Sequence, residues 1–319
     1  MTIRLGVVMD PIGSVNTVKD STYAMVLEAQ QRNWVIQYME MNDLYLKDGT
    51  AGARMRKLEI LSGGNGQWYQ LSDVTDTDLS QLDVILMRKD PPFDTEYIYS
   101  SYILERAENA GVLVINKPQA LRDANEKIFT AWFPQCTPPT LVTREYTDIR
   151  EFLAEHHDII LKPLEGMGGA SVFRVSATDP NLSVIMENLT HHQTRYIMAQ
   201  RFIAEIADGD KRVLVVNGEP VPYSLARIPA PGETRGNLAA GAKGVGRPLS
   251  ERDLWICRQV GPVLKDKGIL FSGLDIIGDY LTEINVTSPT GVRELDHIYD
   301  LNISGRLLDV IEVILEQSK

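Results

Sequence analysis

The chain contains 319 residues, of which 44% are hydrophobic and 24% are charged, with 24 Gly, 16 Pro and 2 Cys. This length suggests about two domains, each large enough to bury a core without disulfides or structural metal, which excludes the disordered and fibrous classes. The formal net charge of −11 repels phosphates, so nucleic acid is not expected as a partner. Any anionic ligand must be held by cations that are concentrated in one cleft.

The N-terminus and the cysteines favour a cytoplasmic protein. The chain opens directly into an apolar run at 3–9, without the basic leader and cleavage site of a signal peptide. No stretch of about 18 apolar residues is free of charge, so we expect neither a membrane-spanning helix nor a membrane partner. Cys136 and Cys257 form no C-x-x-C pair, and we interpret them as reduced thiols.

The first third of the chain alternates short apolar runs with amphipathic segments, which is typical of βαβ units. The expected elements are strands at 3–9, 34–39, 82–87 and 112–115 and helices at 20–32 and 96–110. Nearly continuous Val, Ile and Leu in a strand indicate a parallel sheet covered on both faces. Such sheets bind ligands at the carboxyl ends of their strands, here 10–14 and 88–94.

After Asn116 the pattern changes to strands joined by short loops, which predicts a second fold unit with antiparallel sheets. The expected strands are 159–163, 171–175, 195–203, 211–216 and 220–228. Ser250 followed by Asp253 predicts the start of a helix that buries Cys257 on its apolar face. A last helix carries a similar apolar stripe over 307–315, which we interpret as packing.

A glycine-rich run at 161–171 follows one of these strands. It matches neither the Walker loop nor the Rossmann turn, because a strand rather than a helix comes after it. Its glycines let the backbone approach a phosphate closely, and Lys162 supplies a positive charge at the strand end. The alternative is a plain tight hairpin with a surface lysine.

The run 273–286 predicts a hairpin with an acidic face. A three-residue loop at 278–280 places Asp275 opposite Glu283 and residue 276 opposite 282, so that Asp275, Glu283 and Asn285 share one face. A two-residue loop would mix polar and apolar side chains on both faces. Two carboxylates and an amide oxygen suit Mg²⁺ held together with substrate phosphates. The alternative is a solvated polar face.

The segment 227–248 combines glycines and prolines with the charged residues Arg227, Glu233, Arg235, Lys243 and Arg247. We expect no regular element there, and a long loop of this kind is typical of an active-site cover whose arginines lie over an anion. The alternative is a solvated loop. The five histidines have neither metal nor triad spacing, and no nucleophile elbow is present.

Together these features indicate a nucleotide clamped between two lobes. The chain resembles the ATP-grasp carboxylate–amine ligases and, along nearly its whole length, the bacterial glutathione synthetase family. The segments that carry the resemblance are 86–94, 161–173, 208–213, 232–237 and 281–290. The glycine loop and acidic hairpin indicate only the superfamily, whereas the runs Arg-Lys-Asp-Pro-Pro-Phe-Asp and Thr-Ser-Pro-Thr point to this family.

The resemblance implies an α/β and α+β fold class in three parts. An N-terminal parallel βαβ domain, 1–122, would bind substrate. An ATP-grasp fold of two lobes with antiparallel sheets would follow, with the glycine loop in 123–201. The lobe 202–319 would carry the metal-binding hairpin and the flexible loop 227–248.

The same resemblance implies residues that bind ATP and metal. Lys127 and Lys162 would hold the phosphates, and Gly166, Met167, Gly168 and Gly169 would cover them. Four residues would meet the adenine through their backbone: Gln200, Arg201, Phe202 and Ile203. Asp210 would also lie at the nucleotide. The ligands of Mg²⁺, with Mn²⁺ as a possible substitute, would be Asp275, Glu283 and Asn285.

It further implies residues that act on the other substrates, γ-glutamylcysteine and glycine. Arg212, Arg227 and Arg235 would contact phosphate or the activated carboxylate in catalysis. Substrate would be bound by Arg88, Ser288 and Arg293, the last through the carboxylate of glycine. From the sequence alone, Arg88 could equally pair with Asp90, and Lys127 reads as an exposed lysine at a helix start.

The implied reaction joins γ-glutamylcysteine and glycine through an acyl phosphate and cleaves ATP to ADP and phosphate. The resemblance also implies a homo-oligomer, specifically a tetramer. The chain departs from the family pattern at 241–247 and at Gly291, near the expected acceptor site.

Three alternatives remain. The first is another ATP-grasp ligase with a D-alanine or glutamate acceptor. The second is a nicotinamide-dependent dehydrogenase, although residues 6–11 lack the glycine fingerprint. The third is a nucleotide-gated binding module without turnover, against which the intact acidic ligands argue.

Overall fold

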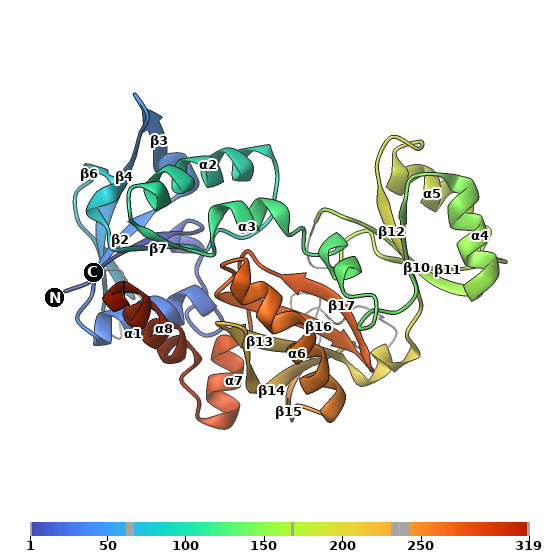
Figure 1. Ribbon diagram of the computed structural model, residues 1–319. Coiled ribbons are helices and arrows are strands. Elements are labelled where there is room, and N and C mark those ends of the chain that lie inside the picture. Colours follow the sequence, from blue (N-terminus) through green and yellow to red (C-terminus); the bar gives the residue numbers. More distant parts are fainter. Residues whose placement is uncertain (1, 62–66, 167–168, 231–235, 237–242, 318–319) are drawn as a thin grey trace.

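The computed structural model describes residues 2–61, 67–166, 169–230, 236 and 243–317, and these form three β-sheets with helices packed around them (Figure 1). Two sheets lie in the main body of the molecule, and the third forms a separate lobe at the right of Figure 1. The expected combination of a parallel-containing sheet with antiparallel sheets is confirmed.

The N-terminal sheet has the order β3-β4-β2-β1-β7-β8, and β5 and β6 pair with β4. Its strands are β1 (Arg4–Val8), β2 (Val35–Met39), β3 (Leu44–Lys47), β4 (Thr50–Ile60), β5 (Tyr69–Leu71), β6 (Thr75–Asp78), β7 (Val84–Met87) and β8 (Leu113–Ile115). The helices packed with it are α1 (Ser21–Gln31), α2 (Thr95–Asn109) and α3 (Pro118–Asp123), with short 3-10 turns at Ile12–Ser14, Met41–Asp43 and Leu79–Gln81.

Strands β2, β1, β7 and β8 run parallel, which confirms the predicted βαβ units to within one or two residues. Strands β3 to β6 add antiparallel pairs between 44 and 78, a stretch to which the sequence pattern assigned no element. Strand β4 is long and has both buried and exposed positions, so its apolar residues do not stand out as one continuous run.

The separate lobe is a four-stranded antiparallel sheet in the order β11-β10-β12-β9. Its elements are β9 (Thr140–Thr143), α4 (Tyr146–His156), β10 (Asp158–Pro163), β11 (Phe173–Ser176), α5 (Leu182–Thr190) and β12 (Ile197–Arg201), preceded by a 3-10 helix at Ile128–Trp132. Helices α4 and α5 cover this sheet with Ile149, Leu153 and Met186, which form a core of its own with Ile159 and Leu161. The hydrophobic core of this lobe is therefore separate from those of the main body.

The C-terminal sheet has the antiparallel order β15-β14-β13-β16-β17. Its elements are a 3-10 turn at Ala204–Asp208, β13 (Asp210–Val216), β14 (Glu219–Ile228), β15 (Lys243–Pro248), α6 (Glu251–Asp266), β16 (Phe271–Ile277), β17 (Tyr280–Asn285), α7 (Val292–Tyr299) and α8 (Ile303–Gln317). Ser250 and Asp253 form the predicted capping box at the start of α6. Cys257 is buried as expected, and both cysteines are free thiols.

The prediction that 227–248 contains no regular element is wrong at both ends. Strand β14 continues through Ile228, and β15 pairs with it from Tyr223 opposite Pro248 to Ile228 opposite Lys243. Glycines are typical of irregular structure, but a Cβ at Gly246 would lie 2.5 Å from the ring of Tyr299. Glycine is therefore needed there for packing. Residues 231–235 and 237–242, which include Arg235, lie outside the described residues.

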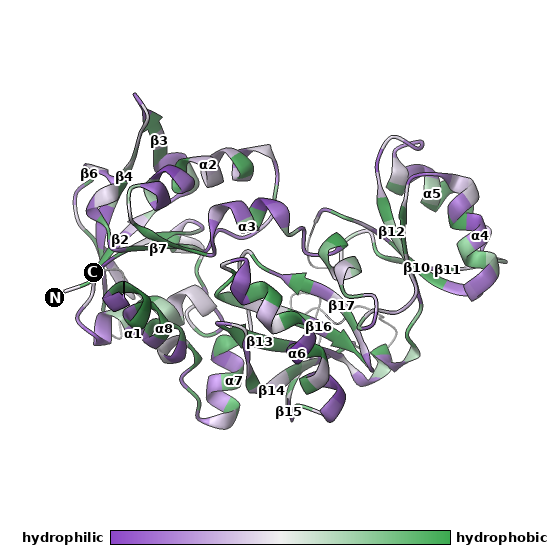
Figure 2. Cartoon of the chain, in the orientation of Figure 1, coloured by the Kyte–Doolittle hydropathy of each residue, from purple (hydrophilic) through white to green (hydrophobic). Residues whose placement is uncertain are grey.

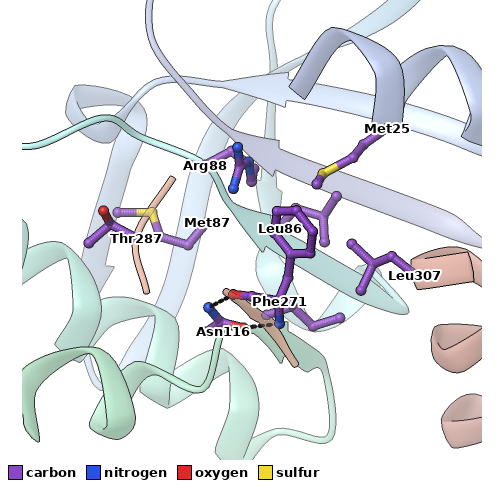
Figure 3. Close-up of a pocket in the computed structure, with 9 residues that line it drawn as sticks. Met25, Leu86, Met87, Arg88, Asn116, Phe271, Thr287 and Leu307 are labelled. Atoms are coloured by element: carbon purple, nitrogen blue, oxygen red, sulfur yellow. Dashed lines mark hydrogen bonds between the residues drawn. The ribbon is translucent and has the colours of Figure 1, made fainter. Parts of the chain in front are cut away.

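Asn116 joins the two large sheets (Figure 3). Its side-chain amide donates to the carbonyls of Phe271, at 2.6 Å, and Val286, at 2.7 Å, and its carbonyl accepts the N–H of Phe271. Apolar residues of both sheets pack in shared clusters, and the central strands are largely hydrophobic (Figure 2). Within the described part of the chain, no helix has the length and apolarity needed to cross a membrane.

Candidate functional site

The predicted hairpin is formed by β16 and β17. Asp275 lies opposite Glu283 and Gly273 lies opposite Asn285, so the three expected ligands share one face of the hairpin as predicted. The predicted loop is wrong, because Ile277 pairs with Tyr280 across a two-residue turn and Ile276 pairs with residue 281. Thr282 is the extra residue of a β-bulge, and its hydroxyl donates to the carbonyl of Asp275 at 3.1 Å. The bulge restores the register that the shorter turn would otherwise shift.

Asp275 is buried and held by two arginines from neighbouring strands. Arg212 on β13 donates from Nε and Nη2 to its two oxygens, at 2.5 and 3.0 Å, and Nη2 of Arg227 on β14 lies 2.8 Å from Oδ2. Burial alone would raise the pKa of this carboxyl, but the two guanidinium groups outweigh burial and hold it below its usual range. Asp275 is therefore ionised and paired with arginine.

Arg227 also pairs with Asp210, which extends the charged network to the start of β13. Burial is the largest influence on Asp210, and together with the neighbouring Asp275 it raises the pKa of that carboxyl to about 7 against the effect of Arg227. Gly236 packs against this pair, since a Cβ there would lie 2.8 Å from Cβ of Asp210.

Lys127 connects the other acidic residue of the hairpin to the glycine loop. Its Nζ lies 3.0 Å from Oε1 of Glu283 and donates to the carbonyl of Gly166 at 2.9 Å. The expectation that this lysine is exposed is wrong, because only 7% of it is accessible. The helix start itself is confirmed as a 3-10 turn, at which Oδ1 of Asn125 accepts the N–H groups of Lys127 and Ile128.

Lys162 approaches the hairpin from β10 of the separate lobe. Its Nζ donates to the carbonyl of Thr282 at 3.2 Å, and the alternative of a surface lysine is wrong because the side chain is buried. Burial is the main influence that lowers the pKa of this ammonium, Glu283 opposes it and Lys127 adds to it, and the net result is a pKa of about 8. Two lysines that come from different segments therefore flank the acidic hairpin.

The hairpin offers oxygen ligands of the type that magnesium prefers. Asn285 donates from Nδ2 to Oδ2 of Asp275 at 3.2 Å, which brings the amide beside the carboxylate. Among the described residues, no cluster of three or more His, Cys, Asp or Glu could hold a metal alone. Asp275 and Glu283 are each paired with cationic side chains, with which a metal ion bound here would share the carboxylates. The donor set fits a hard cation that shares its coordination with phosphate oxygens.

The segment expected at the adenine ends β12. Gln200 is buried and donates to Oγ1 of Thr140 at 3.0 Å. The guanidinium of Arg201 lies 5.2 Å from the ring centre of Tyr280 on the hairpin, while Phe202 packs under Arg174. Ile203 is buried where the chain leaves the sheet.

The glycine loop is described only in part. Gly166 and Gly169 both have positive φ, of 89° and 72°, a conformation that favours glycine. Met167 and Gly168 lie outside the described residues.

The residues expected to bind the other substrates lie where the N-terminal sheet meets the C-terminal part. Arg88 is buried, and it donates to Oγ1 of Thr22 at 3.2 Å and to the carbonyl of Pro289 at 3.1 Å, and not to Asp90 as in the alternative interpretation. It lines a small cavity with Asn116 and Thr287 (Figure 3). Asp90 instead accepts a hydrogen bond from Ser288.

Arg293 lies farther out, on α7. It donates to the carbonyl of Val18 at 3.4 Å, and its guanidinium lies 5.2 Å from the ring centre of Tyr23. These contacts join α7 to α1 and to the loop before it.

Sequence reasoning missed one residue of this region, Glu126. Its carboxylate accepts hydrogen bonds from Val286 and Thr287, just beyond the acidic hairpin. The local pattern predicts a helix start around it, but no sequence signal shows that the partner lies 160 residues away.

Two family models match the chain. The model described as prokaryotic glutathione synthetase, N-terminal domain, covers residues 3–122, and the model described as prokaryotic glutathione synthetase, ATP-grasp domain, covers residues 126–300. Curated glutathione synthetases are similar over nearly their whole length. Identity is 62% over 98% of both chains for Vibrio vulnificus strain YJ016, 61% over 98% of both for Pseudomonas aeruginosa strain PAO1, and 62% over 99% of both for Escherichia coli O6:H1.

Solved structures with the same fold are more distant in sequence. The ATP-grasp ligase PsnB, complexed with minimal precursor, Mg and ADP, has a TM-score of 0.62 and 16% identity over 98% of both chains. D-cycloserine synthetase DcsG has a TM-score of 0.67 and 13% identity over 99% of this chain and 100% of the other. These structures establish the ATP-grasp fold, and the two family models and the relatives at 61–62% identity show that the chain belongs to the prokaryotic glutathione synthetase family.

Proposed function

We propose that this chain joins γ-glutamylcysteine and glycine into glutathione, with cleavage of ATP to ADP and phosphate. The observation that carries the proposal is the match to curated glutathione synthetases over nearly the whole chain. The site geometry supports the reaction type, because cationic side chains from separate segments converge on an acidic hairpin. Such an arrangement suits a substrate that carries several negative charges.

In the proposed site, Asp275, Glu283 and Asn285 hold magnesium, or manganese in its place. These residues would hold the ion where its charge could screen the phosphates that are brought together. Lys127 and Lys162 bind the phosphates, and both already lie at the hairpin. The remaining nucleotide contacts are assigned to Asp210 and to two runs, Gly166, Met167, Gly168 and Gly169 over the phosphates and Gln200, Arg201, Phe202 and Ile203 at the adenine.

A carboxylate is a poor electrophile, so the C-terminal carboxylate of γ-glutamylcysteine is first phosphorylated by ATP. The amine of glycine then attacks the acyl phosphate, and phosphate leaves as the amide forms. Arg212, Arg227 and Arg235 are assigned to stabilise the developing negative charge, and fixed donors of this kind contribute about 10²-fold to 10³-fold each in other enzymes. Arg212 and Arg227 lie at the hairpin, where they pair with Asp275.

Arg88, Ser288 and Arg293 are assigned to the two amino-acid substrates. Arg88 is buried without a described carboxylate partner within 4 Å, and a buried guanidinium of this kind is stabilised by a bound anion. We further propose that the enzyme works in the cytoplasm as a homotetramer and without nucleic acid or membrane. The net charge of −11 supports the absence of a nucleic-acid partner.

The test is an assay of ADP release with γ-glutamylcysteine plus glycine, run in parallel with D-alanine or glutamate as the acceptor. We expect ADP and glutathione to form in equal amounts with glycine and little ADP with the other acceptors. Faster turnover with D-alanine or glutamate would assign the chain to another ATP-grasp ligase. Tight ATP binding without turnover for any acceptor would leave a nucleotide-binding module instead.

A further inference from the structure

Glu126 binds the segment that follows the metal hairpin. Its Oε1 accepts three hydrogen bonds, from the N–H of Val286 at 3.0 Å, the N–H of Thr287 at 3.2 Å and the hydroxyl of Thr287 at 2.8 Å. Its main-chain carbonyl also accepts the N–H of Ile284 at 2.8 Å. One residue therefore fixes the end of β17 and the two residues after it.

The neighbours of Glu126 contact the nucleotide side of the site. Asn125 donates to the carbonyl of Leu164 at 3.1 Å, just after β10, and Lys127 reaches Gly166 and Glu283. Residues 125–127 thus form a short connector between the glycine loop, the metal hairpin and the segment beyond it.

The segment that Glu126 holds contacts the opposite side of the site. Ser288 donates to Asp90, and the carbonyl of Pro289 accepts from Arg88. Arg88 and Ser288 are two of the three residues assigned above to the amino-acid substrates. Residues 286–289 therefore lie between the connector and the part of the N-terminal domain that is proposed to bind γ-glutamylcysteine.

We infer that Glu126 is a positioning residue, which fixes residues 286–289 so that the dipeptide carboxylate meets the nucleotide in the correct geometry. The inference rests on the proposed function. Glu126 acts through Thr287 and the main chain and has no assigned contact with substrate. Small displacements of a bound reactant can cost a large part of the rate, so a connector of this kind affects the use of the dipeptide more than the binding of ATP.

The central variant is Thr287→Val, which keeps the shape of the side chain and removes one of the three hydrogen bonds. We expect the KM for γ-glutamylcysteine to rise about fivefold to tenfold, as is typical for one lost hydrogen bond, with the Kd for ATP unchanged within about twofold. Thr287→Ser keeps the hydroxyl and should restore the KM. Glu126→Gln keeps an oxygen acceptor, so its KM for γ-glutamylcysteine should be close to that of Thr287→Ser. Glu126→Ala removes the acceptor, so its KM should rise more than that of Thr287→Val.

Thr143 provides a matched control in the separate lobe. It is buried like Thr287, and its hydroxyl donates to Oδ2 of Asp148 at 2.7 Å. Thr143→Val should lower the unfolding temperature without changing the KM for the dipeptide. If Thr287→Val behaves in the same way, or weakens ATP binding as much as dipeptide use, the inference is wrong. The inference is equally wrong if Glu126→Gln raises the KM for the dipeptide as much as Glu126→Ala does. The charge of Glu126 would then be required, and not the hydrogen bonds that position residues 286 and 287.

A second measurement does not depend on catalysis. Hydrogen exchange in Glu126→Ala and Thr287→Val should become faster at 284–289 and at 88–90, with β10 and β12 unchanged. Faster exchange confined to 284–287 would contradict the link to the N-terminal domain. If the unmodified chain makes no glutathione, the proposed function fails, and the exchange pattern still decides whether Glu126 organises this segment.

Discussion

Lys127 and Glu283 form an ion pair between the connector at the start of the separate lobe and the acidic hairpin, with Nζ 3.0 Å from Oε1. The pair places a positive charge beside a carboxylate that is assigned to magnesium. It also ties the hairpin to the glycine loop, because the same ammonium donates to the carbonyl of Gly166. The nucleotide site is thus organised by contacts between segments far apart in the sequence.

Glu283→Gln tests the metal assignment. The Glu283 side chain is 24% exposed but its partner Lys127 is buried, so losing the carboxylate should cost about 1–3 kcal/mol in the free energy of unfolding. Turnover should fall by about 10²-fold, because a charged ligand of the metal is lost. Rates over a series of magnesium concentrations, with thermal unfolding as the control, measure both effects. Unchanged rates throughout the series would refute the assignment.

Asp275→Asn should behave differently, because it leaves two buried arginines without their shared carboxylate. Breaking a buried pair of this kind costs about 3–5 kcal/mol, so this variant should lose stability as well as activity. From the sequence alone both substitutions would be expected to leave the fold intact. Urea denaturation of Asp275→Asn, compared with Asp279→Asn on the exposed turn of the same hairpin, decides the matter. Equal stability of the two variants would mean that the arginine network is not a significant stabilising element.

Lys162 should make ATP binding depend on pH. Its pKa lies near 8 in the free chain, since burial disfavours the charged form, and a bound triphosphate favours that form. Affinity should therefore fall as pH rises above about 8, by up to about tenfold per unit, with proton uptake on binding. Calorimetry in buffers of different ionisation enthalpy measures this uptake, and Lys162→Arg should abolish it. Affinity that stays constant to about pH 10 would contradict the role of Lys162.

The stability of the free chain should change with pH in the opposite direction to the affinity for ATP. A lysine whose folded pKa is depressed from 10.5 to about 8 contributes stability above its unfolded pKa, and that contribution is lost as pH falls through about 8. Bound ATP should reverse this trend, because the ammonium is then paired.

Asn116→Ala tests the junction of the two large sheets. The substitution leaves the N–H and carbonyl of Phe271 and the carbonyl of Val286 without their side-chain partner, at buried positions. We expect a loss of about 2–3 kcal/mol in the free energy of unfolding. The control is Asn109→Ala at the exposed end of α2, which should be nearly neutral. If both variants unfold at the same denaturant concentration, the junction contributes little.

Sequence patterns predicted the parts of this molecule that depend on local alternation. The two faces of the hairpin follow from the spacing of Asp275, Glu283 and Asn285, and the capping box follows from Ser250 and Asp253. The predicted turn is wrong because two arrangements place Asp275 and Glu283 on the same face of the hairpin. One is a three-residue loop, and the other is a two-residue turn with a bulge at Thr282. Local sequence does not distinguish these two solutions.

Other features depend on contacts that are distant in sequence. Lys127 is buried and contacts Glu283 and Gly166, and Gly246 of β15 packs against Tyr299 of α7. The partners of Glu126 at 286 and 287 are equally remote. Short-range patterns contain no information on such pairs, so the connector could be recognised only from the fold.

The central claim is that the dipeptide carboxylate is phosphorylated before the amine attacks, and isotope transfer tests it most directly. γ-Glutamylcysteine labelled with ¹⁸O in its cysteinyl carboxylate is incubated with ATP, magnesium, glycine and the enzyme, and the products are analysed by mass spectrometry. An acyl phosphate requires one labelled oxygen in each inorganic phosphate released and one in the new amide of glutathione. Unlabelled phosphate formed together with glutathione would contradict the account.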